Sequence, residues 1–421
     1  MSFVARPDSS PKWADDLPEG WTADWVKWSV AFASAKPDGE DIEKLPYISN
    51  EDIASWTGRL LKEDPEPADK EGRLFRRDDV LFNKLRPYLA KVYHADFDGI
   101  SSGELLNLRA SERVLPRFLF HLLSSYPFVD IINSESFGTK MPRADWEIVG
   151  HQPLPLPDLD TQRRIAGYLD NKTRQIDALI EKKRALLDRL SEKRQALITR
   201  AVTRGLNLDV PLKDSGSKWL GNIPEHWAVR PLKWRVRVQS GQVDPVADEF
   251  KSLPLIAPDH IEQRTGRIVE VRTADEQSAM SGKYLCAPTA VLYSKIRPAL
   301  RKAAVFGNEC LCSADMYALN PGDEVMRDYL LFFLLTEAFS AYAELSSLRV
   351  AMPKVNREAL GVVEICIPPL DEQRAIASYC SEENSKHLVA IDTVEQSVER
   401  LIEYRAALVT SAVKGEMAAL L

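Results

Sequence analysis

The chain has 421 residues, 45% of them hydrophobic, and this length predicts about three domains with buried cores. Its formal net charge of -7 excludes a protein that holds nucleic acid through bulk positive charge, so any DNA binding must come from local patches or from partners. No apolar run approaches the roughly 20 residues that span a bilayer, and the amino terminus lacks the apolar stretch of a signal peptide. We therefore expect a cytoplasmic protein without membrane contact.

The sequence contains an internal repeat. Trp13, Trp21 and Trp28 recur 206 positions later, although only 9 of the 421 residues are tryptophan. From Lys84 onward the offset is 211, which indicates a net gain of five residues inside the second copy. Two copies of one unit predict approximate two-fold symmetry, and double-stranded DNA is the commonest two-fold partner.

Each copy contains the same succession of predicted elements. A Leu/Ile-Pro-Glu-x-Trp segment comes first, alternating β-branched runs then predict strands that end at a proline, an apolar helix follows, and a Pro-rich strand closes the copy. These four elements lie at 17–21, 79–87, 117–123 and 152–157, and again at 223–227, 290–298, 328–335 and 364–369. The body of each copy is therefore predicted to be a mixed α/β globule of about 150 residues.

A long helix of about 45 residues is predicted after each closing strand. Asp160 and Asp371 are the expected N-caps, because a carboxylate can accept the free amides of the first turn. Apolar residues then recur at the 3.5-residue spacing of a helix-helix seam. The predicted seam residues are Ile165, Leu169, Ile176, Leu179, Leu186, Leu190 and Leu197 in the first helix, and Ile376, Ile391, Val394, Val398, Leu401 and Leu408, together with Cys380, His387 and Ala412, in the second.

Charge distinguishes the two predicted helices. Residues 159–205 carry a net charge of +6 and residues 370–416 a net charge of -4. Opposite flanking charges favour antiparallel packing of the two helices within one chain, although two solvated faces would show the same pattern. The predicted fold is α+β with a pseudo-two-fold repeat, and its parts are a first globular domain at 1–157, a first long helix at 158–205, a linker at 206–218, a second globular domain at 219–368 and a second long helix at 369–421.

The sequence shows no motif of an enzyme. It has no Gly-rich phosphate loop, no Asn-Pro-Pro-Tyr or Asp-Pro-Pro-Tyr box, and no histidine spacing that would bind zinc. All five cysteines lie in the second half, and a disulfide or zinc framework would repeat with the fold, so we expect buried, reduced thiols. A nuclease acting through Asp259 and Glu270 is one alternative, but Arg272 stands where such enzymes have lysine, and the first copy lacks the pattern.

Basic residues do repeat, at the ends of predicted elements. Phosphate contacts need flexible cations on rigid edges, and base recognition uses Arg or Lys, so these positions are candidate DNA contacts, although solvated strand ends have the same composition. The candidates are Lys84, Arg86, Lys91, Lys140 and Arg143 in the first copy, and Lys295, Arg297, Arg301, Lys302, Arg349 and Lys354 in the second.

The repeated motifs resemble those of the specificity subunit of type I restriction-modification systems. Each copy opens with Leu/Ile-Pro-x-x-Trp, carries Lys-Leu/Ile-Arg-Pro, and closes with a proline-rich strand followed by Leu-Asp-x-Gln-Arg-x-Ile-Ala, at 159–166 and 370–377. The long helices both end in Ala-Leu-Ile/Val-Thr-x-Ala-Val. The resemblance covers the whole chain.

This resemblance implies that each globular domain is a target-recognition domain that reads one half of a split sequence in double-stranded DNA. The helices would set the spacing and hold two modification subunits, which bind S-adenosylmethionine, and restriction subunits that use ATP and Mg²⁺ would join them. The chain itself would have no cofactor, metal or catalytic residue. An adaptor that binds proteins through its coiled coil, without DNA specificity, is the alternative.

Overall fold

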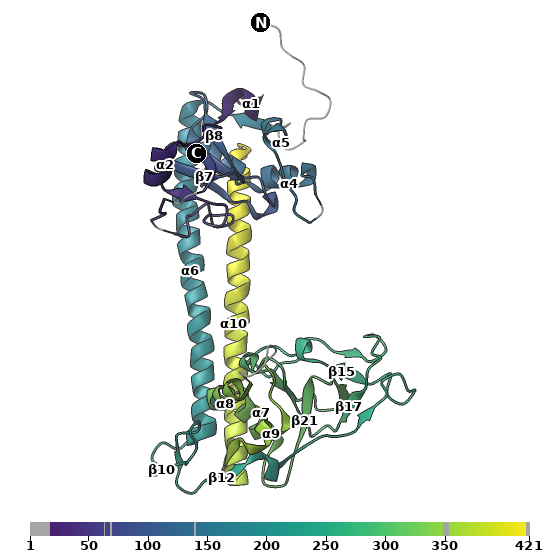
Figure 1. The fold of residues 1–421 in the computed structure, drawn as a ribbon. Coiled ribbons are helices and arrows are strands. Elements are labelled where there is room, and N and C mark those ends of the chain that lie inside the picture. Colours follow the sequence, from purple (N-terminus) through teal and green to yellow (C-terminus); the bar gives the residue numbers. More distant parts are fainter. Residues whose placement is uncertain (1–16, 63, 68–69, 139, 348–352, 418–421) are drawn as a thin grey trace. The chain divides into compact units, whose positions relative to one another are not determined.

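The computed structural model describes residues 17–62, 64–67, 70–138, 140–347 and 353–417. They form two compact units: unit 1 comprises residues 1–182 and 397–421, and unit 2 comprises residues 183–396. The helices α6 (Leu159–Arg204), teal in Figure 1, and α10 (Leu370–Val413), yellow, are each divided between the units. Each long helix thus contributes buried residues to both units.

Unit 1 is built on three small sheets. A four-stranded sheet has the order β2-β8-β5-β6, a three-stranded sheet has the order β3-β7-β4, and β1 pairs with β9. The strands are β1 (Thr22–Trp25), β2 (Val30–Phe32), β3 (Tyr47–Ile48), β4 (Gly72–Phe75), β5 (Val80–Asn83), β6 (Val92–His94), β7 (Gly99–Ser102), β8 (Leu105–Ala110) and β9 (Pro153–Leu156). The shorter helices are α1 (Val26–Ser29), α2 (Gly39–Lys44), η2 (Pro87–Leu89), α3 (Pro116–Leu123), α4 (Tyr126–Glu135) and α5 (Trp146–Gly150).

Unit 2 contains the corresponding sheets in the orders β13-β21-β18-β19, β14-β17-β20-β15-β16 and β12-β22, and a separate hairpin β10-β11. Its strands are β10 (Leu212–Asp214), β11 (Asn222–Pro224), β12 (Ala228–Pro231), β13 (Val236–Val238), β14 (Gln242–Val243), β15 (Pro254–Ile256), β16 (Arg272–Thr273), β17 (Lys283–Cys286), β18 (Val291–Ser294), β19 (Ala303–Ala304), β20 (Cys310–Cys312), β21 (Met316–Pro321) and β22 (Glu364–Ile367). Its shorter helices are η3 (Leu232–Trp234), η4 (Pro258–His260), η5 (Pro298–Leu300), α7 (Arg327–Leu335), α8 (Glu337–Ser347) and α9 (Arg357–Val362).

The two units share one topology. In unit 1 the strand β3 runs parallel to β7 while β4 runs antiparallel to it, and in unit 2 β15 and β17 have the same relations to β20. The strands β14 and β16 extend the second sheet of unit 2. The predicted α+β repeat is therefore confirmed.

Burial along the long helices follows a longer period than the predicted seam. Ile165, Leu169 and Ile176 are buried as expected, but Leu179 and Leu186 are each 43% exposed, so the seam assignment is wrong there. Buried or half-buried residues recur instead every 11 positions, at 165, 176, 187 and 198 in α6 and at 376, 387, 398 and 409 in α10. Eleven residues make three turns at 3.67 residues per turn, which is close to the period of a straight α-helix.

The predicted N-caps of the long helices are also wrong. Asp158, two residues before Asp160, accepts hydrogen bonds from the amides of Asp160 and Thr161 at 3.0 and 2.9 Å. These bonds lower the pKa of Asp158. In the second helix Asp371 lies inside the first turn, after Leu370. The caps precede the leucine because both helices begin at that residue and not after it.

A buried glutamine in the repeated Leu-Asp-x-Gln motif fixes the start of each long helix. The side chain of Gln162 accepts from the amide of Leu115 at 2.7 Å and donates to the carbonyls of Arg113 and Pro157, both at 2.9 Å. Gln373 makes the same three bonds, each 2.8 Å, to Met326, Glu324 and Pro368. Because neither glutamine has exposed surface, these bonds are shielded from water.

The repeated Pro-x-x-Trp motif receives the end of a long helix in each unit. Gly205 follows α6 with φ +74°, and a Cβ on it would lie 3.2 Å from the ring of Trp227. Gly415 follows α10 with φ +77°, and a Cβ there would lie 2.5 Å from Pro18 and 3.0 Å from the ring of Trp21. A glycine in the left-handed conformation is thus required where each helix meets this motif.

All five cysteines are buried and free, as predicted. Within the described residues there is no helix long and apolar enough to cross a membrane. The same part of the chain contains no group of three or more His, Cys, Asp and Glu side chains that could hold a metal ion.

Candidate nucleic-acid interface

In unit 1 the basic residues Lys84 and Arg86 lie on a tight turn after β5. The amide of Leu85 and its carbonyl both bond to the side chain of Asn83, and Arg86 adopts the left-handed conformation with φ +53° before Pro87 opens η2. The amide of Arg86 donates to the carbonyl of Pro142 at 2.7 Å. The structure thereby brings the turn against the loop that carries Lys140 and Arg143.

Unit 2 repeats this arrangement. The hydroxyl of Ser294 donates to the carbonyl of Ile296, and Arg297 is left-handed with φ +48°. The amide of Arg297 donates to the carbonyl of Pro353 at 3.0 Å, and Ile296 bridges Lys354 as Leu85 bridges Arg143. We call each pair of segments, 84–86 with 140–143 and 295–297 with 353–354, a basic turn.

The cations of the basic turns differ in their surroundings. Arg86, Lys140, Arg297 and Lys354 are exposed. Arg143 instead binds both carboxylate oxygens of Glu104, at 2.8 and 2.7 Å. The exposed cations form no ion pair with the residues that the structure describes, so an anion can bind them without displacing one, whereas the charge of Arg143 is already compensated.

Lys295 is the most constrained of these cations. It is half-buried, and its ammonium group bonds to the carbonyl of Ala314. Burial, followed by the positive charge of Lys354, lowers the pKa of Lys295. Two neighbouring lysines in one turn favour a negatively charged ligand, because the ligand would relieve their repulsion.

Lys91 and Lys302 have a structural role in the two units. Each is half-buried, and their ammonium groups donate to the carbonyls of Asn50 at 2.7 Å and Pro258 at 2.6 Å. Arg301 lies directly before Lys302, half-buried, at the end of η5. Arg349, the remaining candidate, lies outside the described residues.

A repeated hairpin beside each basic turn was missed by our sequence reasoning. The bridges between Ile53 and Leu60 and between Ile261 and Ile268 close the two hairpins. Each contains Thr-Gly-Arg, at 57–59 and at 265–267, with an offset of 208 that lies between the two offsets used to align the copies. A search at intermediate offsets would have found it.

The hairpins connect the basic turns to the long helices. Trp56 and Arg264 occupy equivalent left-handed positions, with φ +64° and +65°. Their amides donate to the carbonyls of Ala90 and Arg301, at the ends of η2 and η5. The carbonyl of Trp56 accepts a hydrogen bond from Arg405 at 3.0 Å, and the carbonyl of Arg264 accepts one from Arg194 at 3.3 Å. These two arginines are equivalent, because they lie 211 positions apart.

A second repeated surface lies at the opposite end of each four-stranded sheet. In unit 1, Val30 pairs with Ala110 and Asn83 pairs with Leu105. Trp28, which precedes Val30, and the basic turn, which follows Asn83, therefore lie near opposite ends of β8. Trp28 is 58% exposed and its counterpart Trp234 is 62% exposed. Exposed tryptophan is enriched in protein interfaces.

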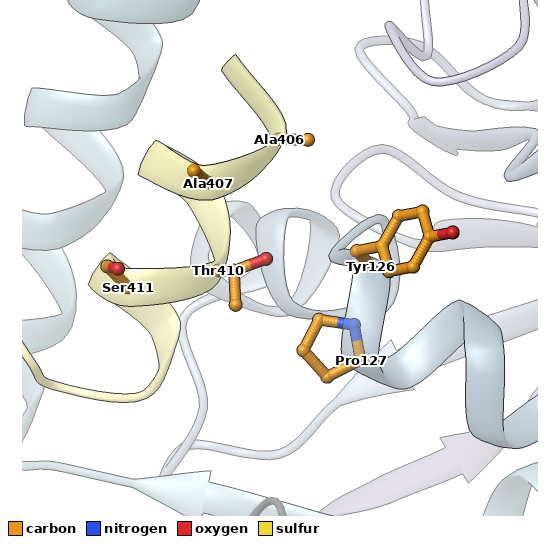
Figure 2. A pocket seen from close by; sticks show the side chains of 6 residues that line it. All are labelled: Tyr126, Pro127, Ala406, Ala407, Thr410 and Ser411. Atoms are coloured by element: carbon orange, nitrogen blue, oxygen red, sulfur yellow. The ribbon is translucent and has the colours of Figure 1, made fainter. Parts of the chain in front are cut away.

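Unit 1 also has an open pocket of about 310 Å³ between α4 and α10. Figure 2 shows Tyr126 and Pro127 on one side and Ala406, Ala407, Thr410 and Ser411 on the other. In unit 2 the position equivalent to Ala406 is Gln195, whose amide group donates to the carbonyl of Leu335 at 2.7 Å. The pocket of unit 1 therefore lies where α10 has the small Ala406 in place of the longer Gln195 of α6.

The nuclease alternative gains no support from the structure. Glu270 forms an ion pair with Arg272 at 2.7 Å, and Asp259 is exposed beside His260. Neither carboxylate belongs to a metal-binding group among the described residues.

A family model for the type I restriction modification DNA specificity domain matches residues 32–189 and 275–382, more than half of the chain. The EcoDI specificity subunit of a type I restriction enzyme from Escherichia coli is 30% identical over 219 residues, which are 49% of this chain and 46% of that subunit. This match therefore spans about half the length of that relative. The MjaVIII specificity subunit from Methanocaldococcus jannaschii is 25% identical over 387 residues, 86% of this chain and 85% of that subunit.

Two solved structures have the same fold. A chain from a structure that describes complex assembly and conformational transition of the type I restriction-modification system has a TM-score of 0.72 at 23% identity and covers 95% of this chain and 99% of that one. The HsdS subunit from Thermoanaerobacter tengcongensis has a TM-score of 0.51 at 22% identity and covers 95% and 98% of the two chains. The chain therefore belongs to the DNA specificity family of type I restriction-modification systems, whose members are non-catalytic subunits that recognise a DNA sequence.

Proposed function

We propose that this chain is the DNA-recognition subunit of a type I restriction-modification complex in which each unit reads one half of a bipartite target. The single observation that carries this proposal is the basic turn, which is built from the same backbone bonds in both units. Phosphate contacts from such a turn would position each unit on the duplex, and neighbouring loops would read base edges. The cytoplasm is the compartment that this role requires.

Exchange of one recognition domain tests this division. Replacing residues 13–157 by the matching domain of a relative should change one half of the methylated target, whereas inserting about four residues, one helical turn, into α6 should keep both halves and alter their spacing. Methylation sites mapped on genomic DNA give the result. A domain exchange that rewrote both halves would contradict the proposal, and a footprint without any protection would favour the protein-binding adaptor.

We also propose two modification subunits, which bind S-adenosylmethionine, as partners, with ATP and Mg²⁺ confined to the restriction subunits. The repeated exposure of Trp28 and Trp234 supports two copies, because one kind of partner surface fits both units. Native mass spectrometry should show one modification subunit bound to Trp28→Ala or Trp234→Ala and none bound to the double variant. Tyr88 is an exposed aromatic residue whose counterpart in unit 2 is Ala299, so Tyr88→Ala is the control and should still bind two.

A further inference from the structure

Three arginines of unit 2 are linked through the backbone at its hairpin. A guanidinium Nη2 of Arg194 donates to the carbonyl of Arg264, and the amide of Arg264 donates to the carbonyl of Arg301, both at 3.3 Å. Arg264 is exposed, Arg301 is half-buried, and Arg194 is only 4% exposed. We call these residues the arginine cluster.

Arg194 is a buried cation whose hydrogen-bonding capacity is only partly used. Its Nε and Nη1 find no acceptor within the described part of the chain, and the same holds for Nε of Arg301. The negative charge of Glu262 favours the charged form of Arg194. Both carboxylate oxygens of Glu262, however, already accept hydrogen bonds from the guanidinium of Arg267, at 2.8 and 3.0 Å. A buried charge without a partner is costly, so its presence requires an explanation such as a bound anion.

The equivalent site in unit 1 contains a carboxylate that the arginine cluster lacks. There Arg405 takes the position of Arg194 and pairs with Asp177 at 2.8 and 3.3 Å. The repeat offset places Leu388 where that aspartate would be, and Trp56 and Ala90 stand in place of Arg264 and Arg301. The same scaffold therefore carries one compensated cation in unit 1 and three cations in unit 2.

Two further carboxylates affect Arg301 of the cluster. Glu337 and Glu344 act on Arg301, and Glu344 also accepts from the hydroxyl of Ser340 at 2.7 Å. Burial and then the positive charge of Arg264 lower the pKa of Arg301, and each outweighs either glutamate. The pKa of Arg301 is thus lowered although two carboxylates act against this shift.

The cluster adjoins the basic turn of unit 2, because Arg297 and Arg301 flank the single turn η5. We propose that Arg264 and Arg301, with Arg194 beneath them, bind one phosphodiester group of the DNA backbone, and that unit 1 makes no such contact. This inference rests on the proposed DNA-recognition function. Arg194 acts as a positioning residue, because its guanidinium holds the hairpin backbone and its charge lies below the anion.

The test measures how DNA affinity depends on salt, with the full chain and its modification subunit on a duplex that contains the mapped target. Loss of one phosphate contact should reduce the slope of log affinity against log salt by about 1, equally for target and non-target DNA. Arg264→Ala and Arg264→Trp, the residue that unit 1 has, should both show this loss. Arg230→Ala removes an exposed arginine of β12 and should keep the wild-type slope.

A variant that supplies the missing carboxylate provides a second arm of the test. Leu388→Asp places a carboxylate where unit 1 has Asp177. It should weaken DNA binding without lowering thermal stability, and this combination would show that the loss of binding comes from charge and not from misfolding. A wild-type slope in Arg264→Ala, or a loss confined to one base pair of the target, would overturn the inference. If the wild-type complex bound no DNA at all, the proposed function itself would fail.

Discussion

The two units share the same local backbone arrangements and differ in the side chains that surround them. The buried glutamine, the basic turn and the left-handed hairpin residue recur in both. Asp177 and Ala406 in unit 1, however, correspond to Leu388 and Gln195 in unit 2. Positions that determine the path of the chain have thus stayed alike, while charge and side-chain volume have diverged.

Removing the glutamine should produce the largest effect, and it should be similar in both units. Gln162→Leu or Gln373→Leu leaves one amide and two carbonyls without their buried partner, which should lower the free energy of unfolding by about 3 kcal/mol. Urea unfolding measures the loss. Gln175→Leu removes an exposed glutamine of α6 as the control, and equal losses in Gln162→Leu and Gln175→Leu would rule out the role assigned to the motif.

The ion pair of unit 1 gives the next effect. Asp177→Leu would leave Arg405, which is 14% exposed, in the situation of Arg194, and should lower the free energy of unfolding by about 2 kcal/mol because a mostly buried charge loses its partner. Asp188→Leu, at an exposed position of α6, is the matched control. Unchanged unfolding of Asp177→Leu would mean that Arg405 does not depend on this carboxylate.

Acid should weaken unit 1 through His121, whose equivalent in unit 2 is Phe332. His121 is buried beside Asp170, Arg117 and Arg405, and burial lowers its pKa below the ordinary 6.5. The unfolded chain therefore binds a proton that the folded chain does not, and stability falls as the pH drops below 6.5, by at most about 1.4 kcal/mol per pH unit. His121→Phe should flatten this dependence in thermal unfolding, and His151→Phe, at an exposed site, should not.

Filling the pocket of unit 1 should have the smallest effect. Ala406→Gln copies Gln195 and places an amide near the carbonyl of Ser124, the equivalent of Leu335, so it should stabilise the chain by about 0.5 kcal/mol. Differential scanning calorimetry can detect this shift. Ala406→Leu fills the space without a hydrogen bond, and an equal gain from it would assign the effect to volume alone.

The sequence was sufficient to predict the elements whose residues repeat. The long helices and the closing strands follow from motif and period. The buried, free cysteines follow from the opposite observation, that they do not repeat with the fold. The seam failed at Leu179 and Leu186 because a 3.5-residue and a 3.67-residue period agree over two turns and then diverge. The hairpin was predictable from its Thr-Gly-Arg sequence, which repeats at an offset of 208. The arginine cluster could not be predicted, because residues 194, 264 and 301 meet only through tertiary contacts.

The division of each long helix between the units has a consequence for the order in which the protein is made. The core of unit 1 includes Val398, Leu408 and Val413, which are synthesised after the whole of unit 2. At roughly 5 to 20 residues per second, about 10 to 40 s separate the synthesis of residue 182 from that of residue 397. Throughout this interval the first 182 residues exist without the segment that completes their core, so the apolar faces of α6 and α3 are open to chaperones and proteases until residues 397–413 have been made.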